Sequence, residues 1–231
     1  MAIYAISDLH LSFSEDKPMN IFGENWTNHE EKIKKDWQEK VKENDVVLMP
    51  GDFSWAMYLE DTYKDFEFLN SLPGKKILLK GNHDYWWTTL KKMREYLKEN
   101  NFENIDFLYN NSYLYENKII VGTRGWSEQE EKPEKIIKRE NQRLEMSLKS
   151  GIEQYGEDKE IIVCMHYPPF NSFEKLDLNF IETMKKYNVK TCIYGHIHGK
   201  EAHKEAFVGD YKGIDIRLVS CDYTNFKLIE I

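Results

Sequence analysis

The chain has 231 residues, of which 41% are hydrophobic, 14% aromatic and 31% charged, and its formal net charge is −8. This composition excludes a disordered chain, and no run approaches the roughly 20 apolar residues that a membrane span needs. The acidic balance argues against a protein that binds nucleic acid or anionic membranes without sequence preference. The length favours one domain over two.

The N-terminal residues lack the positively charged leader of a secretory signal, and their apolar run is short and meets Asp8. The three cysteines, Cys164, Cys192 and Cys221, form no CxxC pair. An odd number of cysteines without a signal indicates reduced thiols, so we expect a cytoplasmic protein whose cysteines are buried as small hydrophobic side chains.

Short apolar runs predict buried strands, and helical patterns lie between several of them. The runs cover residues 3–6, 46–49, 76–79, 119–121, 161–165 and 191–194. The first helical pattern, Ile33, Trp37 and Val41, follows a capping-box signal formed by Thr27 and Glu30. Two further apolar stripes consist of Trp86, Leu90, Met93 and Leu97, and of Ile137, Leu144, Leu148 and Ile152. Helices that alternate with strands predict an α/β core.

The very polar segment 127–160 contains the third helical stripe. We interpret it as an inserted helical excursion that caps the edge of the fold, and a solvated helical hairpin remote from any site is the alternative. The C-terminal part has a different pattern, because apolar runs at 205–208, 214–219 and 226–231 are broken by turn signals and predict antiparallel strands. Two stacked sheets with flanking helices would accommodate both parts of the chain.

Acidic and imidazole residues gather directly after the predicted strands, and five of the seven histidines are among them. In α/β proteins, ligands bind at the carboxyl ends of the strands. Five predicted strand ends therefore deliver polar side chains to one edge of the fold. These side chains are Asp8 and His10, Asp52, Asn82 to Asp84, His166, and His196 with His198.

Taken alone, each group has an ordinary structural interpretation, as a turn, a helix cap or a hydrogen-bonded buried imidazole. Asn82 and Asp84, for example, could cap a helix that starts at Trp86. His196 and His198 are harder to explain by packing, because glycines flank them directly after an apolar run. The occurrence of all five groups at strand ends favours one shared site over five unrelated structural roles.

The set supplies carboxylate, amide and imidazole donors and no thiolate. Such donors suit divalent first-row metals, namely Mn²⁺, Fe²⁺, Co²⁺ or Zn²⁺. One ion takes about four to six ligands, so the set is too large for one ion and fits two. A water that bridges two such ions would supply hydroxide near neutral pH for attack on a phosphate, whose oxygens the ions would hold.

The five groups resemble the five sequence blocks of the calcineurin-like metallophosphoesterase superfamily, and they occur in the same order. The blocks are Asp8-x-His10, Gly51-Asp52, Gly81-Asn82-His83-Asp84, His166 and Gly195-His196-x-His198. They run from residue 8 to residue 198, so the resemblance covers most of the chain. It implies one domain over residues 1–231 that folds as a two-layered β-sandwich flanked by helices, with a dimetal site at one edge.

The resemblance also implies a role for each residue, carried over by its position in the blocks. One ion would be held by Asp8, His10 and His198, the other by Asn82, His166 and His196, and Asp52 would bridge them. His83 would be a free catalytic imidazole that stabilises the transferring phosphoryl group or protonates the leaving oxygen. Asp84 would orient His83 by accepting its ring N–H.

The second block departs from the pattern of many relatives. It reads Gly51-Asp52-Phe53-Ser54-Trp55 and lacks the arginine that contacts phosphate in protein Ser/Thr phosphatases, which argues against that activity. Arg124, after an apolar run and next to a glycine, is a candidate phosphate ligand, with a surface salt bridge as the alternative.

Tryptophans lie near several of the blocks. Trp55 could belong to an aromatic wall for a ring in the substrate, together with Trp86, Trp87 and Trp126, although the helical spacing of Trp86 is more typical of a core residue. His29 and His203 lie outside the blocks and are assigned to the surface.

The preferred function is a phosphoesterase that uses two divalent ions to hydrolyse a phosphate monoester, a phosphate diester or a pyrophosphate by attack of a metal-bridging hydroxide. The expected substrate is small and soluble, with no membrane partner. A nuclease is the alternative among enzymes, and the acidic net charge argues against it. A catalytically inactive protein-interaction scaffold of the same fold is the alternative from another class. The pattern predicts no particular oligomeric state.

Overall fold

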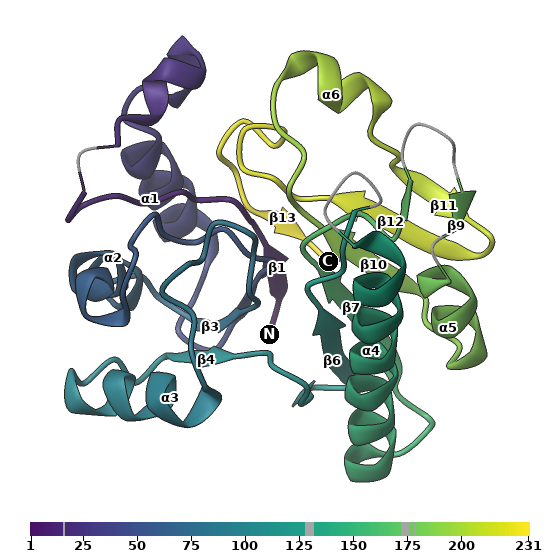
Figure 1. Ribbon diagram of the computed structural model, residues 1–231. Coiled ribbons are helices and arrows are strands. Elements are labelled where there is room, and N and C mark those ends of the chain that lie inside the picture. The colour runs from purple at the N-terminus through teal and green to yellow at the C-terminus, as the bar shows by residue number, and fades with distance from the viewer. Residues whose placement is uncertain (16, 128–131, 172–175, 178) are drawn as a thin grey trace.

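A computed structural model describes the chain except for residues 16, 128–131, 172–175 and 178. Two β-sheets lie face to face, and helices cover the outer face of each (Figure 1). The layers therefore follow the order helix, sheet, sheet, helix, and the predicted α/β sandwich is confirmed. Within the described part of the chain, no helix combines the length and the apolar character that a membrane span requires.

The first sheet has the strand order β13-β1-β2-β3-β4. It consists of β1 (Ile3–Ala5), β2 (Val46–Met49), β3 (Lys75–Leu78), β4 (Ile105–Phe107) and the antiparallel edge strand β13 (Ile229–Glu230). Its outer face carries α1 (His29–Lys40), α2 (Tyr63–Asn70) and α3 (Leu90–Glu99) (Figure 1). Three short 3-10 helices, Met19–Phe22, Glu24–Trp26 and Leu59–Thr62, connect these elements.

The second sheet has the strand order β11-β12-β10-β7-β6-β5. It consists of β5 (Tyr113–Tyr115), β6 (Lys118–Thr123), β7 (Glu160–Met165), β10 (Thr191–Tyr194), β11 (Gly209–Tyr211) and β12 (Ile214–Leu218). The remaining elements are α4 (Pro133–Tyr155), α5 (Phe180–Lys186), α6 (Lys200–Glu205) and a small hairpin of β8 (Phe170–Asn171) and β9 (Leu176–Asp177).

Hydrophobic side chains fill the space between each pair of layers. Along β2, Val46 and Leu48 face the second sheet, whereas Val47 and Met49 pack under the helices, because successive side chains of a strand point to opposite faces. Both faces of the strand are therefore buried, which explains its continuous apolar run. The three cysteines are also buried, as predicted.

The two sheets meet at the edge where their parallel strands end. Ser7, just after β1, forms a parallel bridge with Ser220, just after β12. The backbone N–H of Ser7 donates to the carbonyl of Val219 at 2.9 Å, and that of Cys221 donates to the carbonyl of Ser7 at 3.0 Å. This junction brings the carboxyl ends of strands from both sheets to one place.

Two helices on the first sheet begin where the sequence pattern did not predict. Asn28 precedes α1 in the left-handed conformation, with φ 51° and no side-chain cap, so the expected capping box of Thr27 and Glu30 does not form. Thr89 caps α3 instead of Asn82 or Asp84. Trp86 lies before that helix and is buried in the core of the first sheet.

In the described part of the polar segment 127–160, one long helix is present rather than a helical hairpin. Residues 133–155 form the single continuous helix α4, which packs Ile137, Leu144 and Leu148 against the second sheet (Figure 1). Residues 128–131 of the segment lie outside the described residues.

The C-terminal runs are strands only in part. Residues 205–208 contain the end of α6 and a connection rather than a strand. The other two runs contain β12 and β13. Strand β12 is antiparallel to β11 but parallel to β10, so it extends the parallel part of the second sheet.

Candidate metal centre

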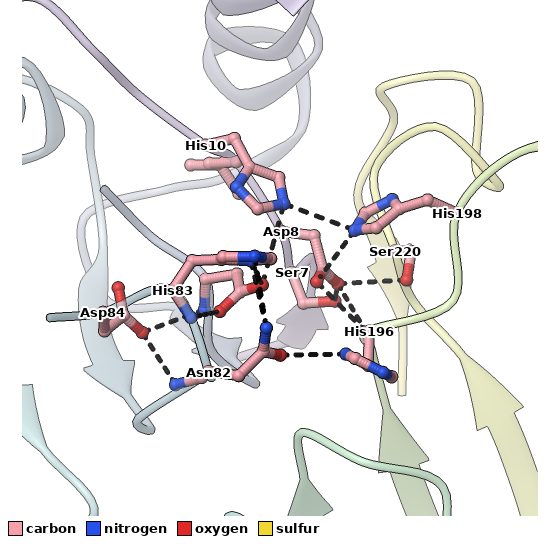
Figure 2. Close-up of polar contacts among 12 residues, drawn as sticks. Ser7, Asp8, His10, Asn82, His83, Asp84, His196, His198 and Ser220 are labelled. Atoms are coloured by element: carbon pink, nitrogen blue, oxygen red, sulfur yellow. Dashed lines mark hydrogen bonds and ion pairs between the residues drawn. The ribbon is translucent and has the colours of Figure 1, made fainter. Parts of the chain in front are cut away.

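All five predicted groups converge at the sheet junction. Asp8 and His10 follow β1, Asp52 follows β2, Asn82 and His83 follow β3, His166 follows β7, and His196 and His198 follow β10. Figure 2 shows how close together the side chains of Asp8, His10, Asn82, His83, His196 and His198 lie. The carboxyl ends of parallel strands lie at one edge of a sheet, and here the edges of two sheets are joined. Residues up to 190 positions apart in the sequence are thereby brought into contact.

The local backbone is strained at the residues that carry the donors. Asp8, His10, Asp52 and His196 have φ values of 60°, 48°, 52° and 72°, in the left-handed region. Side chains other than glycine rarely adopt this conformation, and such residues cluster at functional sites. These turns aim the side chains back over the ends of the strands.

Two glycines of the predicted blocks permit the donors to approach each other. A Cβ atom at Gly81 would lie 2.0 Å from Oδ1 of Asp52, and one at Gly195 would lie 2.4 Å from Oδ2 of Asp8. Both distances are far below van der Waals contact, so any larger residue would displace a carboxylate. This explains why glycine precedes Asn82 and His196.

A first group of donors consists of Asp8, His10 and His198. The Nε2 atoms of His10 and His198 are 3.3 Å apart, and Nε2 of His198 lies 3.2 Å from Oδ1 of Asp8 (Figure 2). These three side chains each offer an atom within 4.8 Å of the others, so they could share one metal ion. Asp8 is fully buried and His10 nearly so.

A second group consists of Asn82, His166 and His196. The side-chain oxygen of Asn82 lies 2.6 Å from Nε2 of His166 and 2.9 Å from Nδ1 of His196. The other ring nitrogen of His166 is paired with the carbonyl of Pro50 at 2.9 Å, which fixes the orientation of the imidazole. Nε2 of His166 is thereby directed at the cluster.

Asp52 lies between the two groups. Its Oδ2 is 3.7 Å from Nε2 of His10, and its Oδ1 is 3.6 Å from Nε2 of His166. One carboxylate therefore faces both groups, each with a different oxygen. This is the arrangement that a bridging ligand between two ions requires.

Four of the donors, His10, His196, Asp8 and Asp52, have pKa shifts that suit metal ligands. Burial lowers the pKa of His10 to about 3. For His196, burial and then the neighbouring His166 lower the pKa to about 3, so both rings are neutral at neutral pH. Burial acts to raise the pKa values of Asp8 and Asp52, but the facing imidazoles outweigh it and hold both carboxyls below their usual range. Neutral imidazoles and ionised carboxylates are the forms that bind metal.

His198 has the opposite character. Burial disfavours its charged form, but the carboxylates of Asp8 and Asp222 raise its pKa to about 10. Nδ1 of His198 contacts Oδ1 of Asp222 at 2.9 Å, which leaves Nε2 for the cluster. A buried nitrogen, Nδ1 of His10, has no hydrogen-bond partner within the part of the chain that the structure describes. The crowded nitrogens and carboxylate oxygens fit a divalent metal centre.

His83 lies beside the cluster and is more exposed than the ligand candidates of the first group, at 32% for its side chain. Its Nδ1 is 2.8 Å from Oδ2 of Asp52, and its ring packs on Trp55 with centroids 4.5 Å apart. Trp55 also stacks on His10 at 4.8 Å. Trp55 therefore packs against two imidazoles of the site.

The expectation that Asp84 orients His83 is wrong. The buried carboxylate of Asp84 accepts hydrogen bonds from the backbone N–H groups of Gly81, Asp52, Phe53 and Ser54 and from Nε1 of Trp86. It ties together the loops after β2 and β3. The contact to the ring of His83 comes from Asp52 instead.

Three supporting residues were missed by the sequence interpretation. Ser7 and Ser220 both donate to Oδ2 of Asp8, the latter at 3.0 Å, and Asp222 holds His198. Ser220 and Asp222 directly follow the apolar run 214–219, so the same strand-end rule could have found them.

The two histidines outside the cluster, His29 and His203, differ in burial. His29 is buried, and its Nε2 lies 2.9 Å from the carbonyl of Leu9, so its assignment to the surface is wrong. His203 is half-buried and lies 3.4 Å from Asp222.

Arg124, the candidate phosphate ligand, follows β6. Its guanidinium lies 4.6 Å from the ring of Trp126, and burial lowers the pKa of Arg124.

Comparisons with known proteins identify a family. The family model described as Calcineurin-like phosphoesterase matches residues 1–200. No protein of the curated collection matches the chain.

Several solved structures share the fold. AQ665, a protein of unknown function from Aquifex aeolicus, aligns over 99% of this chain and 95% of its own, with 21% identity and a TM-score of 0.52. Phosphopantetheinyl hydrolase (PptH) from Mycobacterium tuberculosis aligns over 100% and 95%, with 14% identity and a TM-score of 0.53. TT1561 of Thermus thermophilus aligns over 99% and 97%, with 13% identity and a TM-score of 0.54. At these identities the similarity concerns the fold.

Proposed function

The chain belongs to the calcineurin-like phosphoesterase family, and from this premise we propose that it hydrolyses a small soluble phosphate monoester, phosphate diester or pyrophosphate at a centre of two divalent ions. Family membership makes it a metal-dependent phosphohydrolase. The single observation that carries the proposal is the position of Asp52, whose two oxygens face two separate groups of donors.

In this proposal, the chain provides two ligand sets that share a bridge. Asp8, His10 and His198 hold one ion, Asn82, His166 and His196 hold the other, and Asp52 contacts both. When bound, the ions would supply charge to clamp the phosphate oxygens and hydroxide near neutral pH. The candidate metals are Mn²⁺, Fe²⁺, Co²⁺ and Zn²⁺, because imidazole and carboxylate donors bind all four.

His83 is proposed as the catalytic acid. Its side chain is 32% exposed, and it belongs to neither proposed ligand group. Nδ1 is held by Oδ2 of Asp52 at 2.8 Å, so Nε2, which lies 3.3 Å from Nδ2 of Asn82, is the nitrogen proposed to face the substrate. A proton at Nε2 would be donated to the leaving oxygen, or would form a hydrogen bond to the phosphoryl group. Trp55 keeps the ring in place by packing against its face.

Asp84 is proposed to position rather than to catalyse. By binding the N–H groups of Gly81 and Asp52, it fixes the spacing between the bridging carboxylate and the loop that carries Asn82 and His83. The required geometry is thus built into the metal-free chain, which lowers the cost of ordering the site when the ions bind.

A small substrate is favoured over a polymer. The net charge of −8 opposes an extended nucleic-acid surface, which argues against the nuclease. The scaffold alternative requires the loss of ligands or of the free histidine, whereas every such position is filled here. PptH, a phosphopantetheinyl hydrolase, is a relative in fold at 14% identity, which supports phosphoester hydrolysis as the reaction class without naming the substrate.

The test is an activity screen with added Mn²⁺ over phosphate monoesters, phosphate diesters and pyrophosphates, including bis(4-nitrophenyl) phosphate as a generic diester. We expect turnover that a chelator abolishes and that Asp52→Asn removes. A protein that purifies without bound metal and cleaves no member of the screen would support the scaffold and overturn the proposal.

A further inference from the structure

A cavity of about 400 Å³ opens beside the metal centre. Its walls come from the ends of β3, β4 and β6, from residues 87–89, and from α4. Four cationic side chains line it, although the chain as a whole is acidic: Lys80, Arg124, Arg139 and Arg143. We call this space the basic cavity.

The basic cavity adjoins the metal centre through the backbone. Lys80 lies two residues before Asn82 at the end of β3. The carbonyl of Arg124 accepts hydrogen bonds from the N–H groups of His166, at 3.2 Å, and Tyr167, at 2.9 Å. Since the cavity and the cluster both lie at the carboxyl ends of the strands, one ligand could reach from one to the other.

Positive charges outnumber negative ones in the lining of the basic cavity. Glu140 is the one carboxylate among the lining side chains, and it is 1% exposed. Glu140 pairs with Arg143 at 2.7 Å and with Arg139 at 3.4 Å. Among the described residues, neither Lys80 nor Arg124 has an ion pair or a side-chain hydrogen bond.

Glu140 also orders this wall of the cavity. Its Oε2 accepts a hydrogen bond from the hydroxyl of Thr123 at 2.7 Å, which anchors α4 to the end of β6. Through its ion pairs Glu140 holds the guanidinium of Arg143 at this wall, and more loosely that of Arg139, whose side chain is 51% exposed. An anion that enters the cavity would meet an arrangement of cations that is already assembled, so binding would cost little ordering.

We propose that the basic cavity binds a second phosphate of the same substrate whose phosphoester is cleaved at the metal centre. This inference rests on the proposed function for the identity of the reacting group. A phosphate matches the cavity because guanidinium groups bind its oxygens in pairs and because four cationic side chains line the space against the single lining carboxylate of Glu140. Hydroxyl and amide groups of Thr88, Thr89 and Asn110 line the same cavity and can complete the hydrogen bonds.

The substrate class is therefore a bisphosphorylated small molecule, with one phosphoryl group at the metal centre and the other in the basic cavity. A series of alkane α,ω-bisphosphates of increasing linker length tests this, because it samples the spacing between the two sites. Binding to the Mn²⁺-loaded full chain is measured by calorimetry and compared with the alkyl monophosphate of the same length. We expect at least one bisphosphate to bind about tenfold or more tightly than its monophosphate.

The matched variants remove two positive charges from different places. In K80Q/R124Q we expect the ratio of the bisphosphate affinity to the monophosphate affinity to fall towards one. In K35Q/K98Q, which changes two exposed lysines on α1 and α3, the ratio should equal that of the unmodified chain. Adding inorganic phosphate to the monophosphate should not reproduce the gain, because the two groups act as one ligand.

The inference is overturned if no bisphosphate binds more tightly than its monophosphate, or if the gain persists in K80Q/R124Q. It is also overturned if free phosphate reproduces the gain. The first comparison needs only the unmodified chain, so it stands even if the double variant does not fold. Calorimetry needs no turnover, so a chain that prefers bisphosphates but hydrolyses nothing would contradict the proposed function alone.

Discussion

The backbone N–H of Asp52 donates a hydrogen bond to Oδ2 of Asp84 at 2.9 Å, and the same oxygen accepts from Gly81 at 2.7 Å. One buried carboxylate thereby joins the loop that carries the bridging ligand to the loop that carries Asn82 and His83. The position of Asp52 between the two donor groups depends on this connection.

Asp84→Ala should destabilise the metal-free chain by about 3 kcal/mol. Five N–H donors would lose their acceptor, and buried donors without partners are costly. Urea unfolding measures the change, and Asp210→Ala, at an exposed residue of the edge strand β11, is the matched control. A change in Asp84→Ala no larger than that of the control would show that Asp84 does not hold the loops.

His83→Asn should reduce kcat by about 10²–10⁴-fold and leave two bound ions per chain. The reason is that His83 touches Asp52 and the approach to the site but belongs to neither of the two donor groups proposed to hold the ions. Steady-state kinetics on the best substrate of the screen and metal analysis of the same sample give both numbers. Activity near that of the unmodified chain would remove His83 from the mechanism.

Asp52→Asn and Asp222→Asn should affect the two ions differently. Asp52 faces both donor groups, so Asp52→Asn should lower the affinity of the chain for both ions. Among the proposed ligands in the described part of the chain, Asp222 contacts the ring of His198 alone. Its loss should therefore lower the affinity for one ion by about 10–100-fold and leave the affinity for the other ion unchanged. Equilibrium dialysis with Mn²⁺ measures both affinities. Two ions of unchanged affinity in Asp52→Asn would disprove the bridge.

Lys76 should make the stability of the chain depend on pH. It is fully buried beneath Trp37, and burial lowers its pKa to about 7 in the folded chain. The unfolded chain keeps the ordinary pKa of about 10.4, so between pH 7 and pH 10 only the unfolded chain holds this proton. The contribution of Lys76 to the free energy of unfolding should therefore rise with pH in this window, by up to about 1.4 kcal/mol per unit.

The comparison of Lys76→Met with the unmodified chain isolates this effect. Methionine fills a similar volume without a charge, so the difference in stability between the two proteins should shrink or change sign as the pH rises from 7 to 10. Urea unfolding across this range gives the difference. A difference that stays constant with pH would show that Lys76 remains charged in the folded chain.

The sequence predicted the strands that carry the site and the donors at their ends because both are local patterns, whereas it missed β4 and β5. An apolar run followed by Asp52 or His166 needs no knowledge of distant residues to be recognised. The family blocks then implied the division into two donor groups, and the contacts of Asp52 are consistent with it.

The remaining features depend on contacts between distant residues. His29 follows a helix-start pattern typical of the surface, yet the carbonyl of Leu9 and the ring of Trp26 bury it. The carboxylate of Asp84 was assigned to its neighbour His83, but backbone N–H groups about 30 residues away are its partners. The basic cavity likewise forms only when α4 brings its arginines to Lys80 and Arg124.

The most direct test of the central claim is a crystal structure of the chain with Mn²⁺, with the ions located by anomalous scattering. Two peaks are expected, one at Asp8, His10 and His198 and the other at Asn82, His166 and His196, with the carboxylate of Asp52 in contact with both. A single peak, or two peaks of which only one contacts Asp52, would contradict the claim.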